Sequence, residues 1–216
     1  MLGMGVYSLS EVRRYTGVPA STLWKWFNPS PDRKNPPIFE SDFDRVDDDF
    51  AVSFLNLIEA YVASFFKQQK IKPGDIRRCH DILKNAWGIK HPFAFEDLRT
   101  DGRSIIISRS KDSALIDIIK NQMVFETVRP YLLSISYSKT TRLADTWAIA
   151  EGVVINPRIG FGKPVVEGAG ISTLVLSDQY LANAQDAAVV ARMFKVSAQS
   201  VINAHDFERS RKPLAA

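Results

Sequence analysis

Apolar residues in the first part of the chain recur at helical spacing on both sides of a turn. The stretch YSLSEVRRYTGVPASTLWKWF, residues 7–27, predicts two short helices separated by a tight turn at Thr16–Val18. Ser8 and Glu11 have the spacing of a capping box, and Pro19 stands where the first turn of the second helix tolerates proline. The apolar positions that would pack the helices together are Leu9, Val12, Val18, Leu23 and Trp26. This pattern predicts a helix-turn-helix, whose second helix is the part that can enter a DNA major groove.

Prolines and polar residues interrupt this pattern between residues 28 and 49. The segment holds four prolines, so we expect a loop with at most a short strand near Ile38–Phe39, where a wing would follow a helix-turn-helix. The run Asp47–Asp49 has two interpretations, a metal site or negative charge at the N-terminus of the next helix. The second is favoured because the helix dipole stabilises acidic residues there.

Two longer helices are predicted next. Apolar residues at helical spacing extend from Phe50 to Gln69, and their arc is wider than one core face needs. This helix is therefore either enclosed inside its own domain or packed against a second subunit as well, and the sequence leaves both open. Another helix is predicted over residues 74–87 after Pro73, with Ile76 and Leu83 turned inward.

The periodicity changes after Pro92. Residues 93–108, FAFEDLRTDGRSIIIS, predict a hairpin with Asp101–Gly102 as its turn and Ile105–Ile107 as a β-branched strand. The short apolar runs of residues 112–133 suit strands or short helices. Residues 134–152 are predicted to be a connecting segment.

Residues 153–208 predict a small three-helix unit at the end of the chain. Its apolar positions are Leu174, Leu176, Tyr180, Leu181, Val189, Val190, Phe194, Val201, Ile202 and Phe207. A turn at Val196–Ser197 precedes the third helix, and Ser197 is its predicted cap. The arrangement is a second helix-turn-helix-like pair, and we expect it to bind protein rather than DNA.

Composition narrows the class of protein. The chain has 216 residues, of which 45% are hydrophobic and 24% charged, as in an ordinary globular protein. Cys79 is the only cysteine, so no intramolecular disulfide can form and a reducing cytoplasm is the expected setting. No apolar run reaches membrane-spanning length, so no membrane partner is expected. The net charge is +4, but residues 67–90 carry seven Lys or Arg and two acidic residues, which suits a solvated face or one beside DNA.

The sequence offers little support for catalysis. His80, His91 and His205 are scattered and have no zinc-site spacing, so no metal or other cofactor is predicted. The segment 160–163, GFGK, resembles a phosphate-binding loop, but Pro164 stands where Ser or Thr is needed for Mg²⁺. We therefore interpret it as a rigid turn. Cys79 is interpreted as a packing residue rather than a sensor thiol.

The order of the predicted elements over residues 7–87 resembles the DNA-binding head of the MerR family. The resemblance rests on the first helix pair, the wing-like loop, and FLNLIEAYVASFFKQQKIKPGDIRRCHDILK. It departs from the usual pattern at Arg13, four residues before the turn glycine, where a small residue is usual. The resemblance implies a winged helix-turn-helix that binds DNA. The residues predicted to contact DNA are Tyr7, Arg13, Arg14, Ser21, Thr22 and Lys25.

The segment from Val153 onward resembles a family of bacterial proteins of unknown function that are often encoded beside PIN-type ribonucleases. The matching features are the turn Asn156–Arg158, the loop Phe161–Pro164, the turn Gly168–Ile171 and the three-helix end. Where that family commonly has Thr-Arg after the first glycine and a later proline, this chain has Ala169, Gly170 and Ser172. The resemblance implies the antitoxin of a VapBC-type pair, which masks the ribonuclease and represses its own operon.

An inhibitor of such a ribonuclease needs a cation, because PIN nucleases hold Mg²⁺ with clustered carboxylates. Arginine suits this best, since its planar fork matches a carboxylate. The candidate toxin-binding residues are Arg158, Lys163, Arg209, Arg211 and Lys212. The last three also suit a solvated chain end.

The sequence as a whole predicts an α+β, mostly helical cytoplasmic protein that is not an enzyme. The predicted domains are a winged helix-turn-helix head at 1–90, a β-containing dimerisation segment at 91–152, a trihelical antitoxin-type domain at 153–208 and a basic tail at 209–216. The expected partners are a PIN-domain toxin, operator DNA and a second copy of the chain. A MerR-like transcription regulator without a toxin is the main alternative, and an interaction module whose head does not bind DNA is another.

Overall fold

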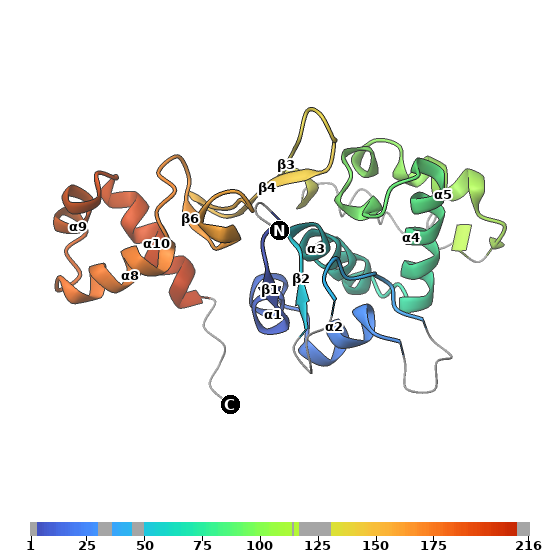
Figure 1. The fold of residues 1–216 in the computed structure, drawn as a ribbon, viewed down its shortest axis with the longest axis horizontal. Helices are drawn as coiled ribbons and strands as arrows, with labels where there is room; N and C mark the ends of the chain where they lie inside the picture. The colour runs from blue at the N-terminus through green and yellow to red at the C-terminus, as the bar shows by residue number, and fades with distance from the viewer. Residues whose placement is uncertain (1–3, 30–35, 45–49, 114, 117–130, 211–216) are drawn as a thin grey trace. The chain divides into compact units, whose positions relative to one another are not determined.

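The computed structural model describes residues 4–29, 36–44, 50–113, 115–116 and 131–210. The chain divides into two compact units (Figure 1). The N-terminal unit is Tyr7–Ala144, and the C-terminal unit combines Met1–Val6 with Asp145–Ala216. Helices and short strands occur in both units, which confirms a mixed, mainly helical architecture. The predicted domain boundaries stay predictions.

The first helix pair forms where the sequence predicts it. Strand β1, Tyr7–Ser8, leads into α1, Leu9–Thr16, and α2 spans Ala20–Phe27. Ser8 Oγ accepts a hydrogen bond from Glu11 N at 3.3 Å and Ser8 N donates to Glu11 Oε2 at 3.0 Å, which completes the predicted capping box. Gly17 ends α1 at a φ of 72°, a conformation that glycine adopts at no steric cost. Leu9 is half-buried, while the other predicted packing residues are buried.

The described residues 36–44 form a loop, as predicted, and the short strand that the sequence allowed near Ile38–Phe39 does not form. The backbone N–H groups of Ile38 and Phe39 instead both donate to Trp26 O, at 2.7 and 2.9 Å. This carbonyl lies in the last turn of α2, where helical carbonyls have no partner within the helix. The rings of Phe39 and Trp26 also meet edge to face, with centroids 6.1 Å apart. The segment therefore closes the end of α2 rather than joining a sheet.

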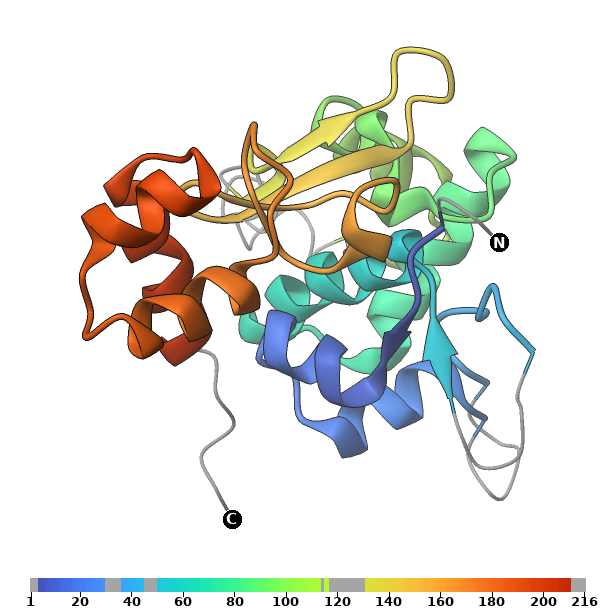
Figure 2. The same ribbon diagram turned by 60° about the vertical axis from the view of Figure 1, so that its left-hand side comes forward.

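A second short strand, β2, spans Ala51–Val52 and pairs antiparallel with β1 (Figure 2). The register places Tyr7 opposite Val52 and Ser8 opposite Ala51. The predicted wing falls partly on residues 30–35 and 45–49, and the Asp47–Asp49 run lies outside the described residues altogether. The wing therefore stays a prediction.

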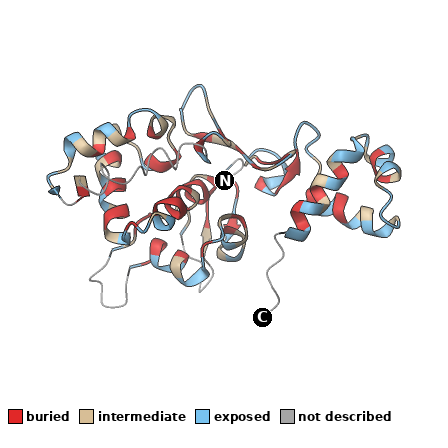
Figure 3. Cartoon of the chain, turned by 180° about the vertical axis from the view of Figure 1, so that it is seen from behind, coloured by how far each residue is buried: buried red, intermediate tan, exposed pale blue. Residues whose placement is uncertain are grey.

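Helices α3, Phe54–Gln68, and α4, Pro73–Trp87, form the centre of the N-terminal unit. Helix α3 begins later than predicted because residues 51–52 are in a strand and Ser53 Oγ caps the helix, accepting from Asn56 N at 3.2 Å. Its buried residues lie on nearly all sides of the helix within a single copy of the chain (Figure 3). The wide apolar arc is therefore largely accounted for inside this unit.

The predicted hairpin over residues 93–108 is wrong. The segment forms short 3-10 helices at Pro92–Ala94 and Glu96–Arg99, named η1 and η2, and then helix α5, Gly102–Arg109. The β-branched run favours a strand locally, but Leu98, Gly102 and Ile106 are buried four residues apart, which is helical spacing. Packing of this one face outweighs the local preference for a strand.

The predicted connecting segment over residues 134–152 is also wrong, because it contains strands. Strand β3 spans Ile135–Tyr137 and β4 spans Ala144–Ala150. Strand β4 pairs antiparallel with β5, Val153–Ile155, with an irregularity between Ala148 and Ala150. Strand β5 pairs in turn with β6, Val165–Val166. Trp147 lies opposite Ile155 and is buried.

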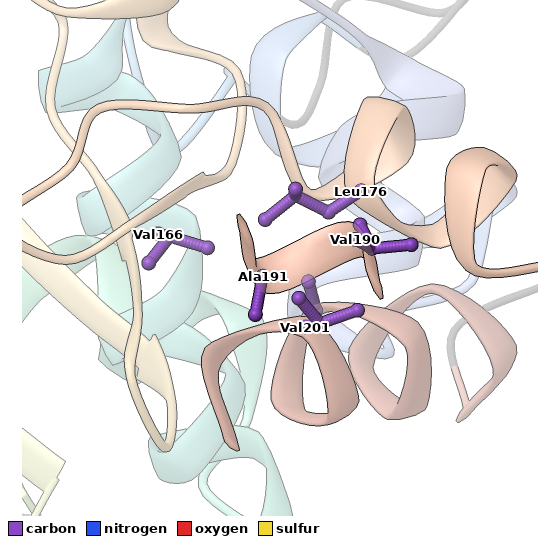
Figure 4. Close-up of a cluster of buried hydrophobic side chains, with 6 residues drawn as sticks. Val166, Leu176, Val190, Ala191 and Val201 are labelled. Atoms are coloured by element: carbon purple, nitrogen blue, oxygen red, sulfur yellow. The ribbon is translucent and has the colours of Figure 1, made fainter. Parts of the chain in front are cut away.

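The predicted three-helix end is confirmed. Helices α8, Thr173–Ala182, α9, Ala187–Phe194, and α10, Ala198–Ser210, enclose a small apolar core (Figure 4). The buried members of this core are Val166, Leu176, Val190, Ala191, Val201 and Ala204. Ser197 Oγ accepts from Ser200 N at 3.0 Å, as expected of the predicted cap.

Helix α9 ends on a strained residue, which allows a stability test. Lys195 has a φ of 56°, in the left-handed region that side chains other than glycine adopt at a cost of roughly 1–2 kcal/mol. We expect Lys195→Gly to raise the free energy of unfolding by about 0.5–1 kcal/mol, after the greater entropy of unfolded glycine is subtracted. Urea unfolding measures this. Lys195→Ala removes the same charge but keeps the strain, so an equal gain from alanine would contradict the explanation.

Candidate functional site

The exposed face of helix α2, with the end of α1 beside it, is the first candidate surface. Ser21 and Lys25 are exposed and Thr22 is half-buried. Arg13 is exposed on α1. These four residues combine hydroxyl groups with cations, which are the groups that contact phosphates and base edges.

Lys67 joins this surface from the last turn of α3. Its Nζ donates a hydrogen bond to Thr22 Oγ1 at 3.3 Å. Sequence reasoning counted Lys67 only as part of a basic segment, because 45 positions separate it from Thr22. A third cation therefore lies on this surface, where it adds to the positive potential that Arg13 and Lys25 supply.

Two predicted DNA contacts lie deeper in the structure. The Tyr7 side chain is fully buried, its ring meets that of Tyr15 edge to face, and burial raises its pKa. Arg14 is half-buried, and its guanidinium carbon lies 5.9 Å from the centre of the Tyr15 ring. Both side chains serve the packing of the first helix pair, so they are not part of the exposed surface around α2.

The loop over residues 156–163 in the C-terminal unit is the second candidate surface. Asn156 fixes the turn, because its Oδ1 accepts from Arg158 N and its Nδ2 donates to Thr146 Oγ1, both at 2.8 Å. The exposed Arg158 guanidinium forms an ion pair with Asp145. Lys163 is exposed at the other end of the loop. Phe161, which sequence reasoning did not single out, is 82% exposed.

The remaining predicted toxin-binding residues are at the end of the chain. Arg209 is exposed near the end of α10. Arg211 and Lys212 lie outside the described residues. The structure thus brings Arg158 and Lys163 together on one loop, and it places Arg209 on a separate element.

A buried charge cluster in the N-terminal unit was not predicted. Glu59, which is 1% exposed on α3, accepts from His80 Nε2 at 2.9 Å and from His91 Nδ1 at 3.0 Å. His91 Nε2 also donates to Asp42 Oδ1 at 3.1 Å, and Lys90 forms an ion pair with the same carboxylate. Four chain segments therefore meet at one cluster, which we call the Glu59 cluster.

Each charged group in this cluster shifts the pKa of its partners so that their charged forms are favoured. Burial alone would raise the pKa of Glu59, but the charge of His80 and hydrogen bonds from both imidazoles outweigh it and hold that pKa below its ordinary value. Burial likewise opposes protonation of His80, yet Glu59 raises its pKa to about 8. For His91, hydrogen bonds to Asp42 and Glu59 overcome burial and raise the pKa to about 9.

The other notable groups offer no chemistry. Cys79 is buried, and burial raises the pKa of its thiol to about 12, so it is a poor sensor thiol. Within the described ranges, no group of three or more His, Cys, Asp or Glu residues is arranged to hold a metal ion. Among the described residues, no helix is long and apolar enough to span a membrane.

A named protein and a solved crystal structure resemble the chain across both units. A protein of Mycobacterium tuberculosis named "Putative antitoxin VapB45" is 29% identical over 190 residues, which is 77% of this chain and 78% of that protein. The crystal structure of Rv2018 from Mycobacterium tuberculosis superposes with a TM-score of 0.74 at 27% identity and covers 93% of this chain and 96% of that one. No protein-family model matches the chain. The similarity thus extends over the N-terminal unit and the C-terminal unit together.

The Glu59 cluster predicts a particular dependence of stability on pH. Histidine pKa values raised above 6.5 stabilise the fold fully below that pH, and the stabilisation is lost as the pH rises through about 8 to 9. The lowered carboxyl pKa values stabilise above about pH 4 and lose this effect on acidification. Stability should therefore peak between about pH 5 and 6.5, and fall on the order of 5 kcal/mol by pH 9.5, because the two histidine pKa values rise from 6.5 to about 8 and about 9.

Urea unfolding at several pH values tests this dependence. We expect Glu59→Gln to be less stable at pH 6 and to show a flatter decline towards pH 9.5, because the partner that raises the histidine pKa values is gone. Glu151→Gln removes an exposed carboxylate from the C-terminal unit and serves as the control. A decline of equal steepness in Glu59→Gln and wild type would contradict the assignment.

Proposed function

We propose that this chain is the antitoxin of a type II toxin–antitoxin pair of the VapBC type. It binds and inhibits a PIN-domain endoribonuclease and represses its own operon. The observation that carries the proposal is the similarity to a protein named as a VapB antitoxin, which spans 77% of this chain. The separation of the chain into two units suits a division of labour between DNA and toxin.

In this proposal the N-terminal unit binds operator DNA. Ser21 and Thr22 at the start of α2 and Lys25 in its last turn approach the major groove, while Arg13 and Lys67 contact the phosphate backbone. A single head of this size covers little DNA. The functional form is therefore a homodimer whose heads lie about 34 Å apart on successive turns of the duplex.

The C-terminal unit binds the toxin. Clustered carboxylates in a PIN active site attract a cation, and Arg158, Lys163 and Arg209 are exposed in this unit. Arg158 already pairs with Asp145, so it must exchange one carboxylate for another on binding. Such an exchange costs less desolvation than burying an unpaired guanidinium. Arg211 and Lys212 are kept as further candidates from the sequence.

A MerR-like transcription regulator without a toxin is the second candidate. It is favoured by the exposed hydroxyl and cationic side chains around α2, which would serve either protein. The neighbouring gene distinguishes them: a PIN-like reading frame favours the antitoxin, and a transporter or enzyme operon favours the regulator.

Co-expression tests the toxin half of the proposal. We expect the chain to restore growth in cells that express the neighbouring PIN-domain nuclease and to co-purify with it, because its cations neutralise the metal-binding carboxylates. A frame-shifted gene that yields the transcript without the protein is the control. Persistent growth arrest despite soluble, full-length protein would rule out the antitoxin function.

Salt-dependent gel shifts test the DNA half. With the DNA upstream of the gene as probe, we expect Lys25→Ala and Lys67→Ala each to weaken binding to all sequences and to reduce the salt slope by about 1, because each variant releases one fewer counterion. Lys139→Ala removes an exposed lysine from the loop after β3 and is the matched control. If all three variants behave alike, the α2 surface is not the DNA contact.

A further inference from the structure

Phe161 combines two unfavourable features at one position. Its side chain is 82% exposed, the largest exposed fraction among the large apolar residues of the described ranges. Its backbone has a φ of 55° and a ψ of 27°, in the left-handed region where a bulky residue is an outlier. A strained residue with an exposed aromatic ring is disfavoured in the free protein on both counts, which is the pattern expected where function selects the side chain.

Backbone hydrogen bonds hold the loop around Phe161. Ile159 N donates to Asn156 O, Gly162 N to Ile159 O and Lys163 N to Gly160 O, each at 3.0 Å. A Cβ atom on Gly160 would lie 3.0 Å from Val165 Cγ1, so the backbone there packs directly against β6. The backbone of the loop is therefore held close to β6.

Other exposed apolar residues of the C-terminal unit lack this combination. Leu174 on α8 is 55% exposed and Met193 on α9 is 57% exposed, and both have ordinary helical backbone. Single apolar side chains on a helix surface are normal and need no functional explanation. Phe161 differs because its backbone is strained as well.

The charges beside Phe161 indicate the chemistry of its partner. Arg158 and Lys163 are exposed on the same loop, Ile159 adds a second partly exposed apolar side chain, and residues 156–163 contain no acidic residue. An apolar pocket bordered by carboxylates complements this surface in both shape and charge. A loop backbone that is already fixed by hydrogen bonds loses little entropy when the ring enters such a pocket.

We propose that Phe161 is the anchor by which the C-terminal unit binds its protein partner. The ring inserts into an apolar pocket whose rim carries acidic residues, and Arg158 and Lys163 pair with that rim. The proposal rests on the proposed function, because it takes this partner to be the PIN-domain nuclease, and it adds an apolar contact beside the cations.

Calorimetric titration of the purified full chain against the catalytically inactive neighbouring nuclease tests the anchor. We expect Phe161→Ala to weaken binding at least 30-fold, as for an aromatic residue at the centre of an interface. Phe161→Gly should weaken it equally while raising resistance to urea, because glycine relieves the backbone strain. Phe161→Trp should retain most of the affinity. Leu174→Ala is the matched control, and its affinity should change less than threefold.

The outcomes separate the anchor from the antitoxin function. If the wild-type chain does not bind the nuclease, the proposed function fails and the anchor fails with it. If the wild type binds and the folded Phe161→Ala variant binds equally well, only the anchor is overturned. A loss in Leu174→Ala as large as that in Phe161→Ala also overturns it, because the effect would then not be specific to the loop.

Discussion

The N-terminal unit depends on the hydrogen bonds between the buried Glu59 carboxylate and the imidazoles of His80 and His91. A carboxylate removed from water is strongly destabilising unless donors surround it, and here two imidazoles supply them at 2.9 and 3.0 Å. The donors come from α4 and from the residue before η1, and His91 passes the contact on to Asp42. Removal of any one member would take one partner from a buried charge, so the four segments are held as a set.

The influence of this cluster reaches helix α2. Asn56, next to the cluster on α3, accepts from Asp42 N and donates to Glu40 O, both at 3.0 Å. Residues 40–42 are thereby fixed, and the preceding Ile38 and Phe39 bond to the carbonyl of Trp26 at the end of α2. The candidate DNA-contacting face of α2 is therefore tied to the buried charges through one short segment. This gives the Glu59 cluster a positioning role for a surface that it does not itself touch.

Local signals explain which parts of this fold could be predicted. The first helix pair has a capping box at Ser8 and a left-handed glycine at position 17, and α4 begins at Pro73. In residues 93–108 the β-branched run favours a strand. The four-residue spacing of Leu98, Gly102 and Ile106 is less conspicuous in the sequence, but these are the residues that are buried in the helical structure. Packing in the core decides between the two structures, and the packing partners come from other segments of the chain. The sequence of one segment therefore does not reveal the outcome.

The candidate sites also divide into features set by local sequence and features set by packing between distant segments. The exposure of Arg158 and Lys163 on one loop could be predicted from a recognisable turn, and their role in binding stays a prediction. The Glu59 cluster could not be predicted, since its members lie at positions 42, 59, 80 and 91, and no spacing within any one segment links them. Lys67 beside Thr22 was missed for the same reason. Contacts between distant positions depend on how the helices pack, which periodicity alone does not determine.

Two of the residues with positive φ in the C-terminal unit, Lys195 and Phe161, call for different explanations. Lys195 adopts the left-handed conformation at the end of α9, where its N–H donates to Ala191 O. The strained conformation therefore allows a hydrogen bond that ends the helix. The hydrogen bonds around Phe161 are made by backbone atoms of its neighbours, and none requires an aromatic ring. Glycine at position 161 would allow the same loop without the strain. The structure thus accounts for the conformation at 161 but not for the phenylalanine, and a contact with another molecule supplies the missing reason.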